Sequence, residues 1–133
     1  MALDLAALPD RTVALLTEPS FAGLTTVRPD GRPHTAAVGF SWDPETRECW
    51  LVLRGSGVEH ANLVVAGGEQ SVTLCQHGGG RWISFEGVLR LVAGPEALAE
   101  TLRRYRSRYG APIGDDPTRV CAVLTMHRAT GTG

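Results

Sequence analysis

The segment Leu24–Phe40 constrains the fold more than any other part of the chain, because it holds two β-type runs around a strong turn sequence. Between them, Arg28-Pro29-Asp30-Gly31-Arg32 supplies a proline with a turn-compatible φ and a glycine that takes a positive φ without steric cost. The sequence therefore predicts a β-hairpin with strands at Phe21–Val27 and Pro33–Trp42.

The second strand of this hairpin alternates between large and small side chains. One face carries the bulkier residues, which are His34, Ala36, Val38, Phe40 and Trp42. The other face carries Thr35, Ala37, Gly39 and Ser41. The first face suits the interior of a barrel, whereas the second leaves the backbone open to close approach by a flat ligand.

Turn signals and periodicity divide the rest of the chain into further strands and helices. Four more strands are predicted, at Glu48–Arg54, Gln70–His77, Arg81–Val92 and Arg119–Arg128. Three helices are predicted, at Pro9–Thr17, Val58–Ala66 and Pro95–Tyr109. We therefore expect residues 1–133 to form a single, mainly β (α+β) domain, a six-stranded antiparallel barrel with two or three peripheral helices.

The composition excludes several kinds of catalyst. All thirteen basic residues are arginine, so Schiff-base chemistry, a lysine general base and a Walker-type phosphate loop are excluded. The four histidines have no metal-ligand spacing, and no serine lies in a Gly-x-Ser-x-Gly frame, so neither a metal site nor a serine hydrolase is predicted.

Charge and hydropathy also limit the partners. The formal net charge is −1, so the chain lacks the excess of basic residues typical of nucleic-acid binding. No apolar run is long enough to cross a membrane. There is no signal-peptide pattern at the N-terminus, so we expect a cytoplasmic protein. Three widely spaced cysteines, Cys49, Cys75 and Cys121, fit buried hydrophobic positions in a reducing compartment.

Two segments have the chemistry of a binding site. Arg54-Gly55-Ser56-Gly57 joins a strand to a helix and could hold a phosphate through backbone N–H groups, although such a sequence is also a common flexible connection. Arg81-Trp82 opens a strand, where the indole could stack on a conjugated ring and the guanidinium could bind a carboxylate. The alternative is that Trp82 belongs to the core and Arg81 to the strand edge.

Other charged residues have structural interpretations. Glu86, inside the same strand, is expected to pair with an arginine. Arg103, Arg104, Arg106 and Arg108 lie on the last helix and are expected to form a solvated face, with an acidic ligand or partner as the alternative.

Four segments together resemble the flavin and deazaflavin split-barrel superfamily related to pyridoxamine-phosphate oxidase. They are Thr25–His34, Ala37–Phe40, His60–Leu63 and Arg81–Gly87. Within this superfamily, Arg104–Tyr109 and Thr118–Val120 make the chain most similar to actinobacterial F420-dependent reductases of the biliverdin reductase type.

The resemblance implies a homodimer in which coenzyme F420 lies in a groove between two split barrels. The strand His34, Thr35, Ala36 and Ala37 would line the cofactor ring. The phosphate and tail would be bound by Arg54, Gly55, Ser56, Gly57, His60 and Asn62. Trp82, with Gln76, would border the ring or the substrate, and Arg81 would be the catalytic residue that orients or polarises a planar, conjugated acceptor such as a tetrapyrrole.

One position departs from the family pattern. Family members commonly carry Arg and Lys, or at least Lys, just before the Ala-x-Asn-Leu element, where this chain has Val58 and Glu59. A carboxylate there opposes phosphate binding. FMN as the cofactor, or a cofactor-free, haem-binding or small-molecule-binding barrel, therefore stay open as alternatives.

Overall fold

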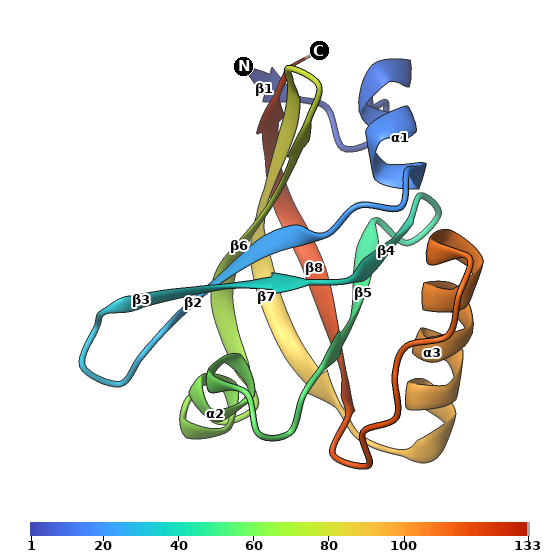
Figure 1. The fold of residues 1–133 in the computed structure, drawn as a ribbon. Helices are drawn as coiled ribbons and strands as arrows, with labels where there is room; N and C mark the ends of the chain where they lie inside the picture. Colours follow the sequence, from blue (N-terminus) through green and yellow to red (C-terminus); the bar gives the residue numbers. More distant parts are fainter. Residues whose placement is uncertain (133) are drawn as a thin grey trace.

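The computed structural model describes residues 1–132 and folds them into one curled antiparallel sheet with three helices outside it (Figure 1). The strands are β1 (Ala2–Leu3), β2 (Ala22–Val27), β3 (Pro33–Val38), β4 (Phe40–Asp43), β5 (Glu48–Leu53), β6 (Glu69–Gly78), β7 (Arg81–Val92) and β8 (Val120–Gly131). The helices are α1 (Asp10–Thr17), α2 (Val58–Val65) and α3 (Pro95–Tyr109). The predicted fold class, the hairpin and all three helices are confirmed.

The described chain has eight strands rather than the predicted six. The short strand β1 pairs with β8 and was not predicted. The predicted strand Pro33–Trp42 is split into β3 and β4 at Gly39. A Cβ at Gly39 would overlap the ring of Tyr105, so a larger residue here would force this ring of α3 to move.

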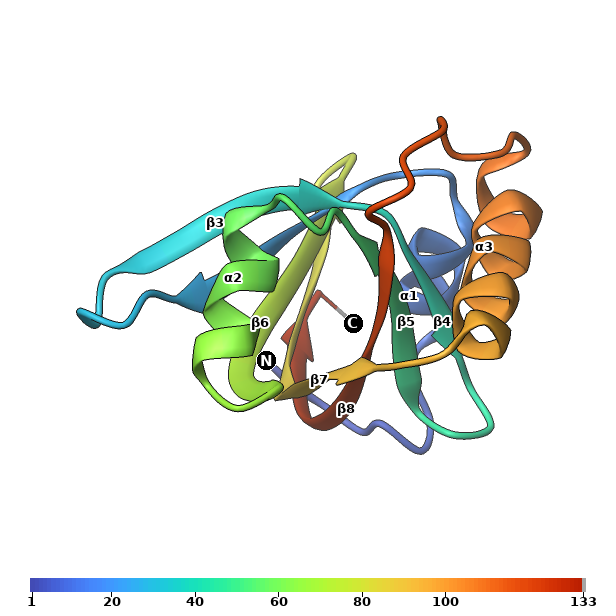
Figure 2. The same ribbon diagram turned by 90° about the horizontal axis from the view of Figure 1, so that it is seen from below.

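The break at Gly39 also explains how the sheet closes. The strand order is β3-β2-β6-β7-β8-β5-β4, which places β3 and β4 at opposite ends. Because a single residue joins these two strands, the sheet must curl until its ends meet, as the view from below shows (Figure 2).

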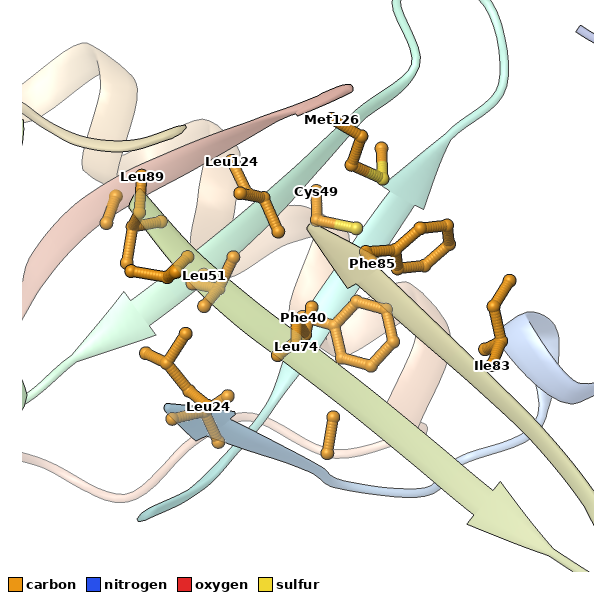
Figure 3. Packing of buried hydrophobic residues seen from close by; sticks show 14 of the residues in the cluster. Leu24, Phe40, Cys49, Leu51, Leu74, Ile83, Phe85, Leu89, Leu124 and Met126 are labelled. Carbon is orange, nitrogen blue, oxygen red and sulfur yellow. The ribbon is translucent and has the colours of Figure 1, made fainter. Parts of the chain in front are cut away.

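The core fills the inside of this curled sheet. Its residues come from seven strands, β2 to β8, and from α1 and α2. Around its centre pack Leu24, Phe40, Cys49, Leu51, Leu74, Ile83, Phe85, Leu89, Leu124 and Met126 (Figure 3). From Thr35 to Phe40 the predicted alternation is confirmed, since Val38 and Phe40 are buried whereas Thr35 and Ala37 are exposed. In β4 it is wrong, because Ser41, predicted on the open face, is buried next to Phe40. Of the cysteines, Cys49 and Cys121 are buried as predicted, and Cys75 is only partly covered.

Each helix covers a different part of the sheet. In Figure 1, α1 lies near the two termini, α2 lies at the opposite end of the barrel, and α3 runs beside β4 and β5. The β2–β3 hairpin projects away from the barrel in both views. No helix among residues 1–132 is long and apolar enough to span a bilayer.

Candidate functional site

A groove of about 340 Å³ lies beside the end of β3, and we call it the β3 groove. Its floor is the junction between β3 and β4, where Ala37 is exposed and Gly39 lies against the ring of Tyr105. Its other lining residues are Phe21, Val38, Val52, Arg54, Glu59, Tyr105, Ile113, Gly114 and Arg119. The small-residue face of the hairpin therefore opens onto a groove with both basic and acidic walls.

The loop between β5 and α2 is fixed by contacts on two sides. His60 Nδ1 lies 2.9 Å from the carbonyl oxygen of Gly55, a hydrogen bond that requires the ring proton on Nδ1. The N–H of Gly55 donates to Thr118 Oγ1 at 3.2 Å, and a Cβ on Gly55 would lie 2.5 Å from the Thr118 carbonyl oxygen. Gly55 and His60 therefore shape the loop and hold Arg54 at the mouth of the β3 groove.

Arg54 carries the unengaged positive charge of this groove. Within residues 1–132, its exposed guanidinium forms no hydrogen bond or ion pair. By contrast, Arg119 donates from Nε and Nη2 to the carbonyl oxygen of Gly114, at 3.0 and 2.8 Å. Ser56, two residues after Arg54, is also exposed. Arg54 is therefore the group best placed to meet an anionic ligand.

Acidic groups offset part of this positive charge. Hydrogen bonds from the hydroxyl and the N–H of Thr118 lower the pKa of Asp116, and the nearby Arg119 and Arg54 lower it further. Asp116 is therefore ionised at neutral pH and faces the same arginines that a bound anion would meet.

Glu59 occupies the N-terminal end of α2. Its carboxylate lies in the first turn, where the helix dipole favours negative charge, and its Oε2 is 3.7 Å from Nε2 of His34. On the other side of the ring, His34 Nδ1 lies 3.3 Å from Nη2 of Arg28. His34, a predicted cofactor residue, thus lies between the guanidinium of Arg28 and the carboxylate of Glu59. The Glu59 carboxylate also occupies the N-terminal end of α2, where a phosphate would otherwise bind.

The remaining predicted residues of this end divide into exposed and buried groups. Thr35 and Ala37 are exposed on the open face of β3, and Thr35 Oγ1 is 2.8 Å from Thr25 Oγ1. Ala36 is partly covered. Asn62 is buried, and its Nδ2 donates to Thr26 Oγ1 at 3.0 Å, which fastens α2 to β2. Asn62 therefore supports the site from beneath rather than lining it.

Arg81, Trp82 and Gln76 lie at the other end of the barrel. Strand β6 runs from the α2 end to the turn that precedes Arg81, and this turn lies near the termini in Figure 1. Arg81 Nη2 donates to Glu18 Oε2 at 2.8 Å, and the Trp82 side chain is exposed rather than part of the core. Within one chain these residues do not converge with His34 and Arg54.

Gln76 is buried, and both ends of its amide are engaged. Nε2 donates to the carbonyl oxygen of Leu15 at 2.7 Å, and Oε1 accepts from Arg108 Nη2 at 3.0 Å. With 1 % of its surface exposed, Gln76 presents no polar atom to a ligand in this structure.

The arginines of α3 correct one expectation from the sequence. Arg103 and Arg106 are exposed, but Arg104 and Arg108 turn toward the sheet, where their guanidinium groups stack over the rings of Trp50 and Phe40, each at 4.3 Å. An amphipathic pattern cannot predict this, because a long arginine side chain can cover apolar surface while its charge finds polar partners. Glu86, as expected, pairs with an arginine, Arg128, at 3.6 Å.

Two walls of the β3 groove were not predicted as site residues. Tyr105 was predicted only as part of the helix Pro95–Tyr109, and Arg119 only as the start of the last strand. Gly39 was the available signal for Tyr105, because a glycine inside a strand pattern often marks the close approach of another group. Arg119 comes from a distant part of the sequence, and no local pattern points to it.

The sequence as a whole matches a known family model. The model described as pyridoxamine 5'-phosphate oxidase matches residues 8–131. The chain belongs to this family. Among family relatives, an F420H2-dependent biliverdin reductase of Mycobacterium tuberculosis (strain CDC 1551 / Oshkosh) is 34% identical over 125 residues, which cover 94% of this chain and 88% of the relative.

Solved structures share the fold of this pyridoxamine 5'-phosphate oxidase family member. A conserved hypothetical protein from Mycobacterium tuberculosis superposes with a TM-score of 0.75 and 24% identity, covering 94% of this chain and 84% of the other. An F420 reductase superposes with a TM-score of 0.71 and 23% identity, covering 92% and 98%. At this level of identity the likeness supports the fold alone.

Proposed function

We propose that this protein is an F420-dependent reductase that transfers a hydride to a planar, conjugated small molecule of the tetrapyrrole kind. The observation that carries the proposal is the β3 groove, in which the unpartnered guanidinium of Arg54 stands beside the exposed residue Ala37. The relative that is 34% identical over 94% of the chain uses F420H2 and acts on biliverdin by its name, which supports the cofactor and the substrate class.

The residues present fit such a cofactor in most respects. A planar ring needs a flat surface without large side chains, and the exposed face at Thr35 and Ala37 provides one. A phosphate needs a cation and hydrogen-bond donors, and Arg54 with the hydroxyl of Ser56 would supply them. When bound, the reduced deazaflavin would supply the hydride.

The chain's own residues would position the substrate and exclude water. In this proposal, Trp82 stacks on the conjugated acceptor, and Arg81 orients it and stabilises the negative charge that develops on it. The proton that completes the reduction comes from solvent, so the reaction needs no nucleophilic side chain.

A second copy of the chain would bring the two ends together. Arg81 and Trp82 lie at the opposite end of the barrel from His34 and Arg54 (Figure 1). A ligand bordered by both groups therefore needs a homodimer, with one end contributed by each subunit. We propose this arrangement, in which the cofactor groove lies between the subunits.

Glu59 favours a second candidate function. Its carboxylate lies at the N-terminal end of α2, where it opposes a phosphate. A barrel with this residue could bind a small molecule without a phosphorylated cofactor, or could bind haem.

One titration distinguishes these functions. The purified protein is mixed with F420, FMN or haemin, and the absorbance of each ligand is followed. We expect the deazaflavin band to shift on binding, with saturation at one ligand per subunit. A shift for FMN alone would change the cofactor, a shift for haemin alone would favour the haem-binding alternative, and no shift with any of the three would contradict the reductase function.

A further inference from the structure

A second groove of about 320 Å³ lies on the other side of α3, and we call it the α3 groove. It runs between the end of α1, the strand β4 and the C-terminal half of α3. Its lining includes Thr17, Ser41, Trp42, Arg104, Ser107 and Arg108. None of these residues lines the β3 groove, so the inference below is independent of the proposed function.

Positive charge exceeds negative charge at this groove. Arg104 donates to Asp43 Oδ2 and to Glu100 Oε1, each at 3.0 Å. Arg103, which also borders the groove, forms an ion pair with the same Glu100. These two carboxylates neutralise two of the three guanidinium groups.

Arg108 is the third guanidinium, and its partners are all uncharged. Its N–H groups donate to the carbonyl oxygens of Glu18 and Phe40 and to Gln76 Oε1, at 2.6 to 3.0 Å. The carboxylate of Glu18 is bound to Arg81 instead. Burial lowers the pKa of Arg108. The guanidinium group has five N–H bonds, and the four hydrogen bonds of Arg108 use four of them. The second N–H of Nη1 is therefore free among the residues that the structure describes.

The hydroxyl of Ser41 is the second observation. Ser41 is 93% buried, with 7% of its surface exposed, and it lines the groove. No partner for its Oγ occurs in the part of the chain that the structure describes. Its cross-strand neighbour Trp50 has a buried indole Nε1–H that is also without a partner there. Trp50 does not line the groove, so the Ser41 hydroxyl is the free donor that faces it, and solvent still reaches this oxygen.

We propose that the α3 groove binds an oxyanion, either a phosphate or a carboxylate group, through the Ser41 hydroxyl and the free N–H groups of Arg104 and Arg108. An oxyanion has several lone pairs, so it can accept from the hydroxyl and from guanidinium groups together. It would also compensate the charge of Arg108. Because the groove is open to solvent, the anion can belong to a larger ligand.

The test is a titration of the full-length protein with inorganic phosphate and, separately, with acetate, at constant ionic strength maintained with chloride. Binding is followed by the fluorescence of Trp42 and Trp50 and by the amide NMR signals of Ser41 and Ser107. We expect saturable binding of one anion, with signal changes confined to these residues and their neighbours. Stronger binding of phosphate would indicate that the natural ligand carries a phosphate ester. Stronger binding of acetate would indicate that it carries a carboxylate.

Two variants locate the binding. Ser41→Ala removes one hydrogen bond to a charged ligand and should weaken binding about tenfold. Ser107→Glu adds a carboxylate at the exposed rim and should weaken binding at least as much. Arg106→Gln is the matched control, because it changes the net charge equally on the adjacent, exposed position of α3 outside the groove, and binding should stay unchanged.

Two results would overturn the proposal. One is the absence of saturable binding of either anion beyond the chloride control. The other is binding that Ser41→Ala and Ser107→Glu leave as tight as in the native protein. Loss of F420 binding has no bearing on this test, because the probes are simple anions and the β3 groove is not altered.

Discussion

The β3 groove and the α3 groove have similar volumes, but their arginine side chains differ in how many partners they have within the chain. In the α3 groove, Arg104 and Arg108 are fixed by carboxylates, carbonyl groups and aromatic rings. In the β3 groove, Arg54 has no partner among residues 1–132, and Glu59 stands nearby. The difference teaches that most N–H groups of Arg104 and Arg108 are used to hold the barrel together, whereas the whole guanidinium of Arg54 is available to a ligand. Changes to the first should therefore reduce stability, and changes to the second should reduce binding.

The largest effect is expected at Gln76, which links α1 to Arg108. Gln76→Leu leaves the Leu15 carbonyl oxygen and an Arg108 N–H unpaired, so the free energy of unfolding should fall by about 3 kcal/mol. Urea denaturation measures this change. Gln70→Leu is the matched control, because Gln70 makes the same kind of paired hydrogen bonds, to Val27, in an exposed position. Equal losses in both variants would contradict the structural role of Gln76.

Arg81→Ala tests the remote end of the proposed dimeric site. Turnover should fall by about a hundredfold, because a donor to the developing negative charge is lost. Stability should change by only about 1 kcal/mol, since the Glu18 carboxylate that pairs with Arg81 is half-exposed. Steady-state kinetics and thermal unfolding measure the two quantities. Unchanged turnover would remove Arg81 from the mechanism.

Arg54→Ala tests the β3 groove directly. The Kd for F420 should rise about thirtyfold, because a charge-assisted hydrogen bond to the phosphate is lost. Stability should stay the same, since the guanidinium makes no contact within the described residues. Fluorescence titration gives the Kd, with Arg11→Ala on the exposed face of α1 as the control of equal charge. If both variants bind equally well, Arg54 is not part of the site.

Glu59→Gln should change binding in the opposite direction. Removing a carboxylate that opposes the phosphate should tighten F420 binding about fivefold. Glu96→Gln is the matched control, because Glu96 also lies in the first turn of its helix. Weaker binding in Glu59→Gln would indicate that Glu59 accepts a hydrogen bond from the ligand instead.

The smallest effect is expected at Asp43, whose ionisation contributes to how the free energy of unfolding changes with pH. Burial raises the pKa of this carboxyl, but hydrogen bonds from Arg104 and from the N–H groups of Glu45 and Thr46 outweigh it, so the pKa lies below its usual 3.8. A lowered folded-state pKa gives stability that is present above the unfolded pKa and lost as the pH falls through the folded value. Asp43→Asn should therefore reduce stability by about 1 kcal/mol at pH 7 and flatten its decline below pH 4. Parallel urea curves from pH 7 to pH 3 measure both effects, and an unchanged slope in acid would contradict the assignment.

Several features were predictable from the sequence because they depend on local chemistry. The hairpin follows from the Pro-Asp-Gly turn, α3 from its three- and four-residue periodicity, and the open face of β3 from the alternation of large and small residues. The family resemblance added the arrangement of the barrel, which the match over residues 8–131 confirms.

The tertiary structure decided how these elements use their polar side chains. At Gly39, where β3 ends and β4 begins, the chain packs against Tyr105, which is 66 residues later in the sequence. Gln76 and Asn62 are buried because α1, α2 and α3 pack over them. Arg108 turns inward because the carbonyl oxygens of Glu18 and Phe40, on two other segments, accept hydrogen bonds from its guanidinium. The hairpin sequence determines its own shape, since its turn and alternation act over a few residues. Whether a polar side chain is free to bind a ligand depends on partners that are distant in sequence, and only folding brings them into contact.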